Sequence, residues 1–91
     1  SVDSYNFASD NSNLTVYVRN SGQIVTCSAI YVNGVLLPTV NYSVNSDTNT
    51  FPAGSAVTLF INNTASWTTG QNTIKIVCTD TTQREFNVNK P

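Results

Sequence analysis

The sequence contains no histidine, no methionine and few charges, with four Lys and Arg against five Asp and Glu among 91 residues. The cationic side chains are scattered. This scatter excludes a nucleic-acid-binding surface, which needs clustered positive charge, and it excludes a basic helix that lies on a membrane surface. Without an imidazole, a catalytic nucleophile would need a carboxylate or a lysine as its base. The acidic residues form no close-spaced pair, so we expect a protein without enzymatic activity.

Metal ligands are equally scarce. Zinc prefers four nitrogen or sulfur ligands, and the chain offers two thiols and no imidazole. The stretch Asp10–Asn13 holds one carboxylate, which is too few for a hard cation such as calcium. We therefore expect no bound metal and no cofactor. No apolar run approaches the roughly 18 residues of a membrane span, so we expect membrane contact only through a helix that is not in this sequence.

Uncharged polar residues take the place of charge. Serine, threonine and asparagine (10, 13 and 13) together supply 36 of the 91 residues, as is typical of secreted β-proteins and of surfaces that carry sugar. Three Asn-X-Ser/Thr sequons begin at Asn13, Asn41 and Asn62, and we expect all three to be accessible for N-glycosylation. In a chain so rich in Asn, Ser and Thr, a few sequons also arise by chance.

Apolar and polar residues alternate as in half-buried β-strands, and helical spacing does not persist. Asn33-Gly34 predicts a two-residue type I′ hairpin turn, because both central positions of that turn need positive φ. About six to eight short strands, with turns roughly every 8 to 12 residues, predict an all-β fold, an antiparallel immunoglobulin-like β-sandwich of about seven strands. It would be a single domain over residues 1–91, with residues 1–12 as a linker or an edge strand. Trp67, in the longest connection, either anchors a partner or caps one end of the sandwich.

The two cysteines have an inward strand phase. Cys78 is in phase with Ile74 and Ile76, and Cys27 is in phase with Val25. A disulfide between Cys27 and Cys78 would join facing sheets, and its loop of about fifty residues would stabilise the fold by roughly 4 kcal/mol in the chain-entropy model. We expect this bridge, and with it an oxidising extracellular setting or a hyperthermophile. The alternative is two small buried apolar side chains without a bridge.

The strand around Cys27 contains a conflict of phase. If Cys27 points inward, Ile30 and Val32 point outward unless one residue is skipped, and a β-bulge near Ser28–Ala29 would skip it. The other solution is a strand covered on both faces, with an apolar interaction face on the outside. The members of that face would be Tyr17, Ile30, Val32, Phe60 and Val77.

The order of the motifs LTVYVRNSGQIVTCSAIYVNG, FPAGSAVTLFIN and WTTGQNTIKIVCTDTTQREFNV resembles the globular part of archaeal type IV pilin-like proteins, the pilins and archaellins. The matching elements are Asn20-Ser-Gly22, Tyr31–Gly34, Pro52-Ala-Gly54 and Gly70–Thr79, and the likeness covers about residues 13–89. The family's apolar N-terminal helix, which forms the filament core, is missing here. The resemblance therefore implies the immunoglobulin-like head domain of a longer subunit. The family also includes accessory proteins that anchor the archaellum to the cell envelope.

The resemblance implies an extracellular structural or adhesive subunit of an archaeal surface filament, either a type IV pilus or an archaellum. Its partners would be other filament subunits or the surface-layer protein, together with glycans. Two alternatives stay open. One is an accessory sandwich domain that anchors an appendage to the surface layer, and the other is a carbohydrate-binding or spacer module of a secreted protein.

Overall fold

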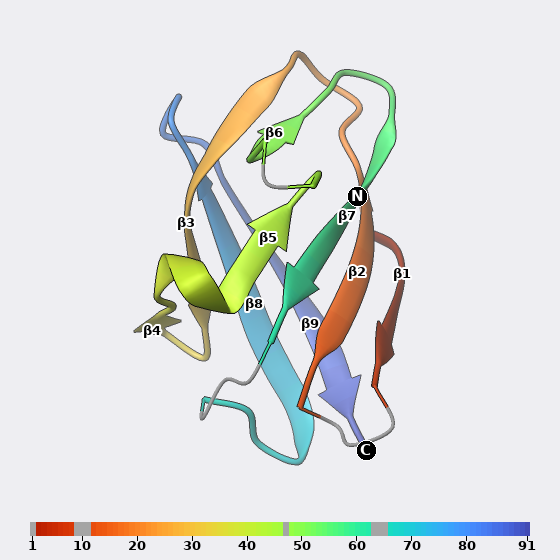
Figure 1. Cartoon of the computed structure of the whole chain (residues 1–91), viewed down its shortest axis with the longest axis vertical. Coiled ribbons are helices and arrows are strands. Elements are labelled where there is room, and N and C mark those ends of the chain that lie inside the picture. Colours follow the sequence, from red (N-terminus) through yellow and green to blue (C-terminus); the bar gives the residue numbers. More distant parts are fainter. Residues whose placement is uncertain (1, 9–11, 47, 63–65) are drawn as a thin grey trace.

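The computed structural model describes residues 2–8, 12–46, 48–62 and 66–91, and these form nine strands and a 3-10 turn (Figure 1). The strands are β1 (Val2–Phe7), β2 (Leu14–Arg19), β3 (Val25–Val32), β4 (Val35–Leu36), β5 (Tyr42–Val44), β6 (Thr50–Phe51), β7 (Ala56–Ile61), β8 (Gly70–Cys78) and β9 (Gln83–Lys90). The 3-10 turn, η1, spans Thr39–Asn41 and joins β4 to β5.

The strands form two sheets, one with the order β1-β2-β7-β5 and one with the order β4-β3-β8-β9, where β6 also pairs with β3. Every neighbouring pair is antiparallel. An immunoglobulin sandwich sets strands A, B, E and D against C, F and G. The order here is the same, with β4 added beside β3. The prediction of an antiparallel immunoglobulin-like β-sandwich is confirmed.

Alternation along the strands builds the core between the sheets. On β7, Val57, Leu59 and Ile61 are buried, and the residues between them face outward. The same period on β8 buries Ile74 and Ile76, as expected for strands with one covered face. The remaining buried apolar residues are Leu14, Val16, Cys27, Ile30, Val32, Leu37, Val44, Phe51, Cys78 and Val88.

A β-bulge in β3 resolves the conflict of phase. The register pairs Cys27 with Cys78 and then Ala29 with Val77, so Ser28 is the extra residue of the bulge. Because one residue is skipped, Cys27 and Ile30 can both face the core, and Ile30 has no exposed surface. The bulge predicted near Ser28–Ala29 is confirmed.

The turn after β3 also matches its prediction. Asn33 has φ 51° and Gly34 has φ 82°, the two positive angles that a type I′ turn needs. Asn33 donates its backbone N–H to the Thr73 carbonyl at 2.8 Å, so this turn is tied to β8.

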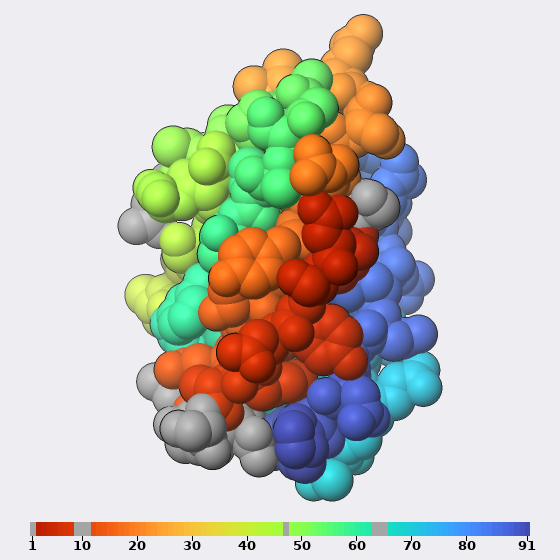
Figure 2. All heavy atoms as spheres, turned by 90° about the vertical axis from the view of Figure 1, so that its right-hand side faces the viewer, coloured from red at the N-terminus to blue at the C-terminus, as the bar shows by residue number. Residues whose placement is uncertain are grey.

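Strand β1 is an edge strand that lies over the seam between the two sheets. It pairs with β2, and in Figure 2 it runs as a red band between β2 and the blue β9. The Asn89 N–H of β9 donates to the Tyr5 hydroxyl at 2.9 Å. The first and last strands of the domain therefore meet along one edge of the sandwich.

Candidate interaction surfaces

A cavity of about 540 Å³ opens between the sheets at the end where β3 begins and β8 ends. Arg19, Asp80, Arg84 and Glu85 are its charged lining residues. A pocket with an apolar wall and a few polar groups suits an apolar group of a ligand or a partner. The apolar lining residues are Val2, Val18, Ile24, Val25, Phe51, Ile76, Cys78 and Phe86.

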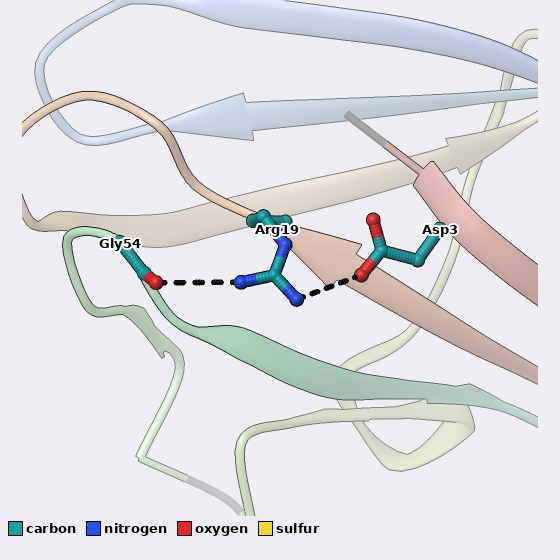
Figure 3. A network of polar contacts seen from close by, with 3 residues as sticks. All are labelled: Asp3, Arg19 and Gly54. Carbon is teal, nitrogen blue, oxygen red and sulfur yellow. Dashed lines mark hydrogen bonds and ion pairs between the residues drawn. The ribbon is translucent and has the colours of Figure 1, made fainter.

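Arg19 ties three segments together beside this cavity (Figure 3). Its Nη2 donates to Asp3 Oδ2 at 3.2 Å, and its Nη1 donates to the Gly54 carbonyl at 3.4 Å. These contacts join the start of β1, the end of β2 and the turn before β7. Both charged side chains are solvent-exposed, so the ion pair contributes at most about 1 kcal/mol.

A second surface, which we call the β4–η1 edge, consists of Val35, Leu36 and Val40. Their exposed fractions are 52%, 56% and 83%, unusually high for three large apolar side chains within six residues. Leu37 between them is buried and donates its N–H to the Ile30 carbonyl at 2.9 Å. This edge lies at the end of β3 that is remote from the cavity (Figure 1).

Two aromatic side chains share the outer face of the four-stranded sheet. The register pairs Tyr17 with Thr58 and Thr15 with Phe60. The two rings are therefore diagonal neighbours on adjacent strands, which is within reach of aromatic side chains. Tyr17 is exposed and Phe60 is half-buried.

The predicted five-residue interaction face is wrong as a unit. Ile30 and Val32 have no exposed surface, because the bulge turns them into the core. Val77 pairs with Ala29 and alternates with buried neighbours, so it faces outward from the other sheet. Of the five residues, only Tyr17 and Phe60 lie together on the outer face of one sheet.

The three sequon asparagines lie in one row across the four-stranded sheet. Leu14 and Tyr42 both pair with Ile61. Asn13 and Asn41 immediately precede Leu14 and Tyr42, and Asn62 immediately follows Ile61, so the three asparagines flank the same register position at the ends of β2, β5 and β7. Asn62 donates its N–H to the Asn41 carbonyl at 2.8 Å, and Asn41 Nδ2 donates to the Asn62 carbonyl at 2.9 Å. All three asparagines are half-buried rather than fully exposed. Asn63 and Thr64 of the third sequon lie outside the described residues, as do Asp10 and Asn11 of the calcium candidate.

The two cysteines are neighbours within one sheet. Cys27 on β3 is directly opposite Cys78 on β8, and both are buried free thiols. Burial, and secondly the charge of Cys78, raise the pKa of Cys27 to about 11. Burial likewise raises the pKa of Cys78. The prediction that a Cys27–Cys78 bridge would join facing sheets is wrong, because β3 and β8 are adjacent strands of one sheet. The immunoglobulin bridge would instead join the positions of β2 and β8. A bridge between the two cysteines within this sheet stays a prediction.

Asn72 is a fully buried polar side chain that the sequence analysis missed. Its Oδ1 accepts hydrogen bonds from Asn33 Nδ2 at 2.8 Å and from the Thr68 N–H at 2.9 Å. Its Nδ2 donates to the carbonyls of Thr68 and Gly70 at 2.9 and 3.0 Å. This network fastens the connection before β8 to the β3–β4 turn. The sequence signal that could have revealed it is its position two residues before Ile74, which gives a polar side chain the same inward strand phase as a core residue.

Trp67 occupies the capping position. Its ring meets Phe7 edge-on, with centroids 5.3 Å apart, and its Nε1 donates to the Ser12 carbonyl at 3.1 Å. The side chain packs against the core.

On the outer face of the five-stranded sheet, Lys75 Nζ lies 4.7 Å from the centroid of the Tyr31 ring, a cation–π contact.

These features define an immunoglobulin-like sandwich whose distinctive surfaces suit contact with other molecules. In the part of the chain that the structure describes, no three His, Cys, Asp or Glu side chains gather where they could hold a metal ion. The described residues also contain no helix long and apolar enough to cross a membrane.

Solved archaeal structures share this fold. The chain is similar to a structure of the archaellum periplasmic stator protein complex FlaF and FlaG from Sulfolobus acidocaldarius, with 18% identity over 96% of this chain and 85% of that chain, and a TM-score of 0.67. It is also similar to the archaellum periplasmic stator protein FlaG from the same organism, with 19% identity, coverage of 96% and 95%, and a TM-score of 0.67. No family model matches the chain, and no curated protein matches it.

Proposed function

We propose that this domain is a structural accessory part of an archaellum-like apparatus outside the cytoplasmic membrane, where it holds another protein of the assembly or the surface layer. The observation that carries the proposal is the likeness to two stator structures over nearly the whole chain. The absence of histidine fits a role in binding rather than catalysis. The extracellular location follows from the same role.

The stator neighbours favour an accessory role over that of a filament subunit. FlaF and FlaG were solved as a complex, so an immunoglobulin-like sandwich of this shape can serve a stator by contact with a second protein. A pilin or archaellin head would instead make repeated contacts with copies of itself. The distinction is one of stoichiometry, because a filament subunit is abundant in the filament and an anchor is not.

The β4–η1 edge is the contact surface that we assign to this role. Val35, Leu36 and Val40 expose more than half of their surfaces, and apolar side chains grouped on a surface mark interaction sites. The three side chains that form this edge carry no charge. A partner should therefore bind through apolar contact that is weakly sensitive to salt.

The first experiment measures where the protein resides and how much of it is there. A tagged copy is expressed in the source organism, cells are cross-linked, and sheared filaments and envelopes are quantified separately by mass spectrometry. We expect the protein in the envelope fraction, cross-linked to a surface-layer or archaellum protein, with only traces in filaments. Bulk incorporation into filaments would establish a filament subunit instead.

The second experiment tests the surface. Leu36→Ser combined with Val40→Ser should abolish the cross-link while the domain stays folded, because both side chains are exposed. Ile24→Ser is the matched control, since Ile24 is a large apolar residue with 64% exposure at the other end of β3. Loss of the cross-link in the Ile24 variant alone would move the contact to the cavity end.

A further inference from the structure

The backbone places Cys27 and Cys78 at a non-hydrogen-bonded position of the ladder. Cys27 donates its N–H to the Asn49 carbonyl at 2.6 Å, and Cys78 donates to the Thr82 carbonyl at 2.9 Å, so neither bonds to the other. The flanking bond runs from the Thr79 N–H to the Thr26 carbonyl at 2.9 Å. Residues paired in this way have Cα atoms about 4.5 Å apart, which is within the range of about 4.4–6.8 Å that a disulfide spans.

The side chains of the pair point to the same face. Both cysteines turn toward the core, with 6% and 7% of their surfaces exposed. Their proximity is also evident in the raised pKa of Cys27, to which the charge of Cys78 contributes after burial. The extra residue Ser28 adjoins Cys27, and a bulge lets a strand bend locally.

The cavity gives one of the two thiols an approach from solvent. Cys78 belongs to its lining, whereas Cys27 does not. A cavity of about 540 Å³ is large enough for part of a small disulfide molecule. The cavity is therefore a route by which a reagent can reach Cys78, although the two residues are buried to almost the same extent.

We propose that Cys27 and Cys78 form a cross-strand redox pair that a low-molecular-weight disulfide oxidises through Cys78. The Cys78 thiolate attacks the reagent RSSR, forms a mixed disulfide and releases one thiolate RS⁻. The Cys27 thiolate then attacks the Cys78 sulfur, forms the intramolecular disulfide and releases a second RS⁻. The two cysteines lose two protons and two electrons, and RSSR becomes two RSH. The closed bridge would link β3 and β8, the two inner strands of the five-stranded sheet, at the end where β3 begins and β8 ends.

The test uses the reduced 91-residue chain and glutathione disulfide. We expect the intact mass to fall by about 2 Da, iodoacetamide to label neither cysteine, and the Tm to rise by roughly 10 °C or more. Because both thiols are almost fully protonated at neutral pH and the thiolate is the attacking form, formation of the disulfide should accelerate as the pH is raised. Disulfide-linked dimers without internal closure, or two alkylatable thiols after treatment that closes the urea-unfolded chain, would overturn the proposal.

Two single-cysteine variants test the order of the steps. In Cys27→Ala the glutathione adduct on Cys78 should persist, because no second thiol resolves it. In Cys78→Ala the native chain should form the adduct at least tenfold more slowly, since Cys27 does not line the cavity. Equal rates for the two variants would refute entry through Cys78, and circular dichroism of each variant confirms that the comparison is made between folded proteins.

Discussion

Asn72 shows how one buried amide can organise a connection between strands. Both of its amide atoms are fully used, and its side chain has no exposed surface. A buried amide in this position specifies one geometry, because any shift would leave buried donors and acceptors unpaired.

Replacing this residue should be costly. Asn72→Ala removes the acceptor of the Thr68 N–H and one of the two acceptors of Asn33 Nδ2. We therefore expect the free energy of unfolding to fall by about 1–3 kcal/mol in urea titrations. The control is Asn89→Ala, an exposed position on β9, which should change it by less than about 0.5 kcal/mol. Equal effects of the two substitutions would show that the network contributes nothing.

The thiol of Cys27 should react slowly in the native protein. Its pKa is raised to about 11, first by burial, so in Cys78→Ala the alkylation rate should still rise about tenfold per pH unit between pH 8 and 10. The urea-unfolded chain should level off near pH 9, where an ordinary thiol is mostly ionised. A native rate that levels off near pH 9 would contradict the burial effect. By linkage, the reduced fold loses stability as the pH rises from about 9 toward 11.

At the scale of the element, the bulge in β3 sets which side chains form the core. Deleting Ser28 would move Ile30 and Val32 to the outer face or turn Cys27 outward. We expect a loss of about 3–6 kcal/mol or complete unfolding, because two large buried side chains would become exposed. The measurement is the urea midpoint with near-ultraviolet circular dichroism.

The matched control keeps the bulge. Ser28→Ala removes only an exposed hydrogen bond from Ser28 Oγ to the Val77 carbonyl, 3.0 Å long, and should cost less than about 1 kcal/mol. A deletion no more harmful than this substitution would show that the strand can slip without penalty.

Strand β7 offers a second contrast between two neighbouring residues. Leu59→Ala should destabilise the domain by about 2–5 kcal/mol, because Leu59 has no exposed surface. Phe60→Ser changes a half-buried ring on the outer face and should cost less than about 2 kcal/mol, with the fold retained. An equally large loss for Phe60→Ser would show that the Phe60 ring contributes as much to stability as a core side chain.

At the scale of the whole molecule, the scarcity of charge governs how stability responds to its surroundings. Without histidine, no side chain with an ordinary pKa titrates between about pH 5 and 8. In the β8–β9 turn, hydrogen bonds from the Thr82 hydroxyl and N–H lower the pKa of Asp80. The ionised Asp80 carboxylate therefore contributes to the stability of the fold at pH values above the ordinary carboxyl pKa. This contribution is lost as the pH falls through the lowered pKa.

We therefore expect a Tm that changes by no more than about 2 °C between pH 5 and 8, and that falls below about pH 4. Between about 0.05 and 1 M sodium chloride it should vary by only a few degrees, because exposed ion pairs contribute little. Differential scanning calorimetry measures both. A steep loss of stability near pH 6 would contradict this account.

The strands and the bulge could be predicted because alternation and phase are local properties of a sequence. The Asn33-Gly34 turn followed from backbone sterics at two residues. Strand neighbours are not local: two inward-facing cysteines fit facing sheets as well as one sheet, and only the pairing of β3 with β8 decides between them. For the same reason, the sequence alone could not show that Tyr17 and Phe60 lie on one sheet face and that Val77 lies on the outer face of the other sheet.

The shared direction of β1 and β9 has a mechanical consequence. Val2 lies beside the cavity, whereas Lys90 pairs with Gly70 at the other end of β8. Tension that pulls Val2 and Lys90 apart along the long axis therefore acts parallel to both strands. It loads the β1–β2 and β8–β9 hydrogen bonds together in shear, instead of peeling them apart one by one. A domain with this geometry resists extension along its strands while it remains easy to open from the side.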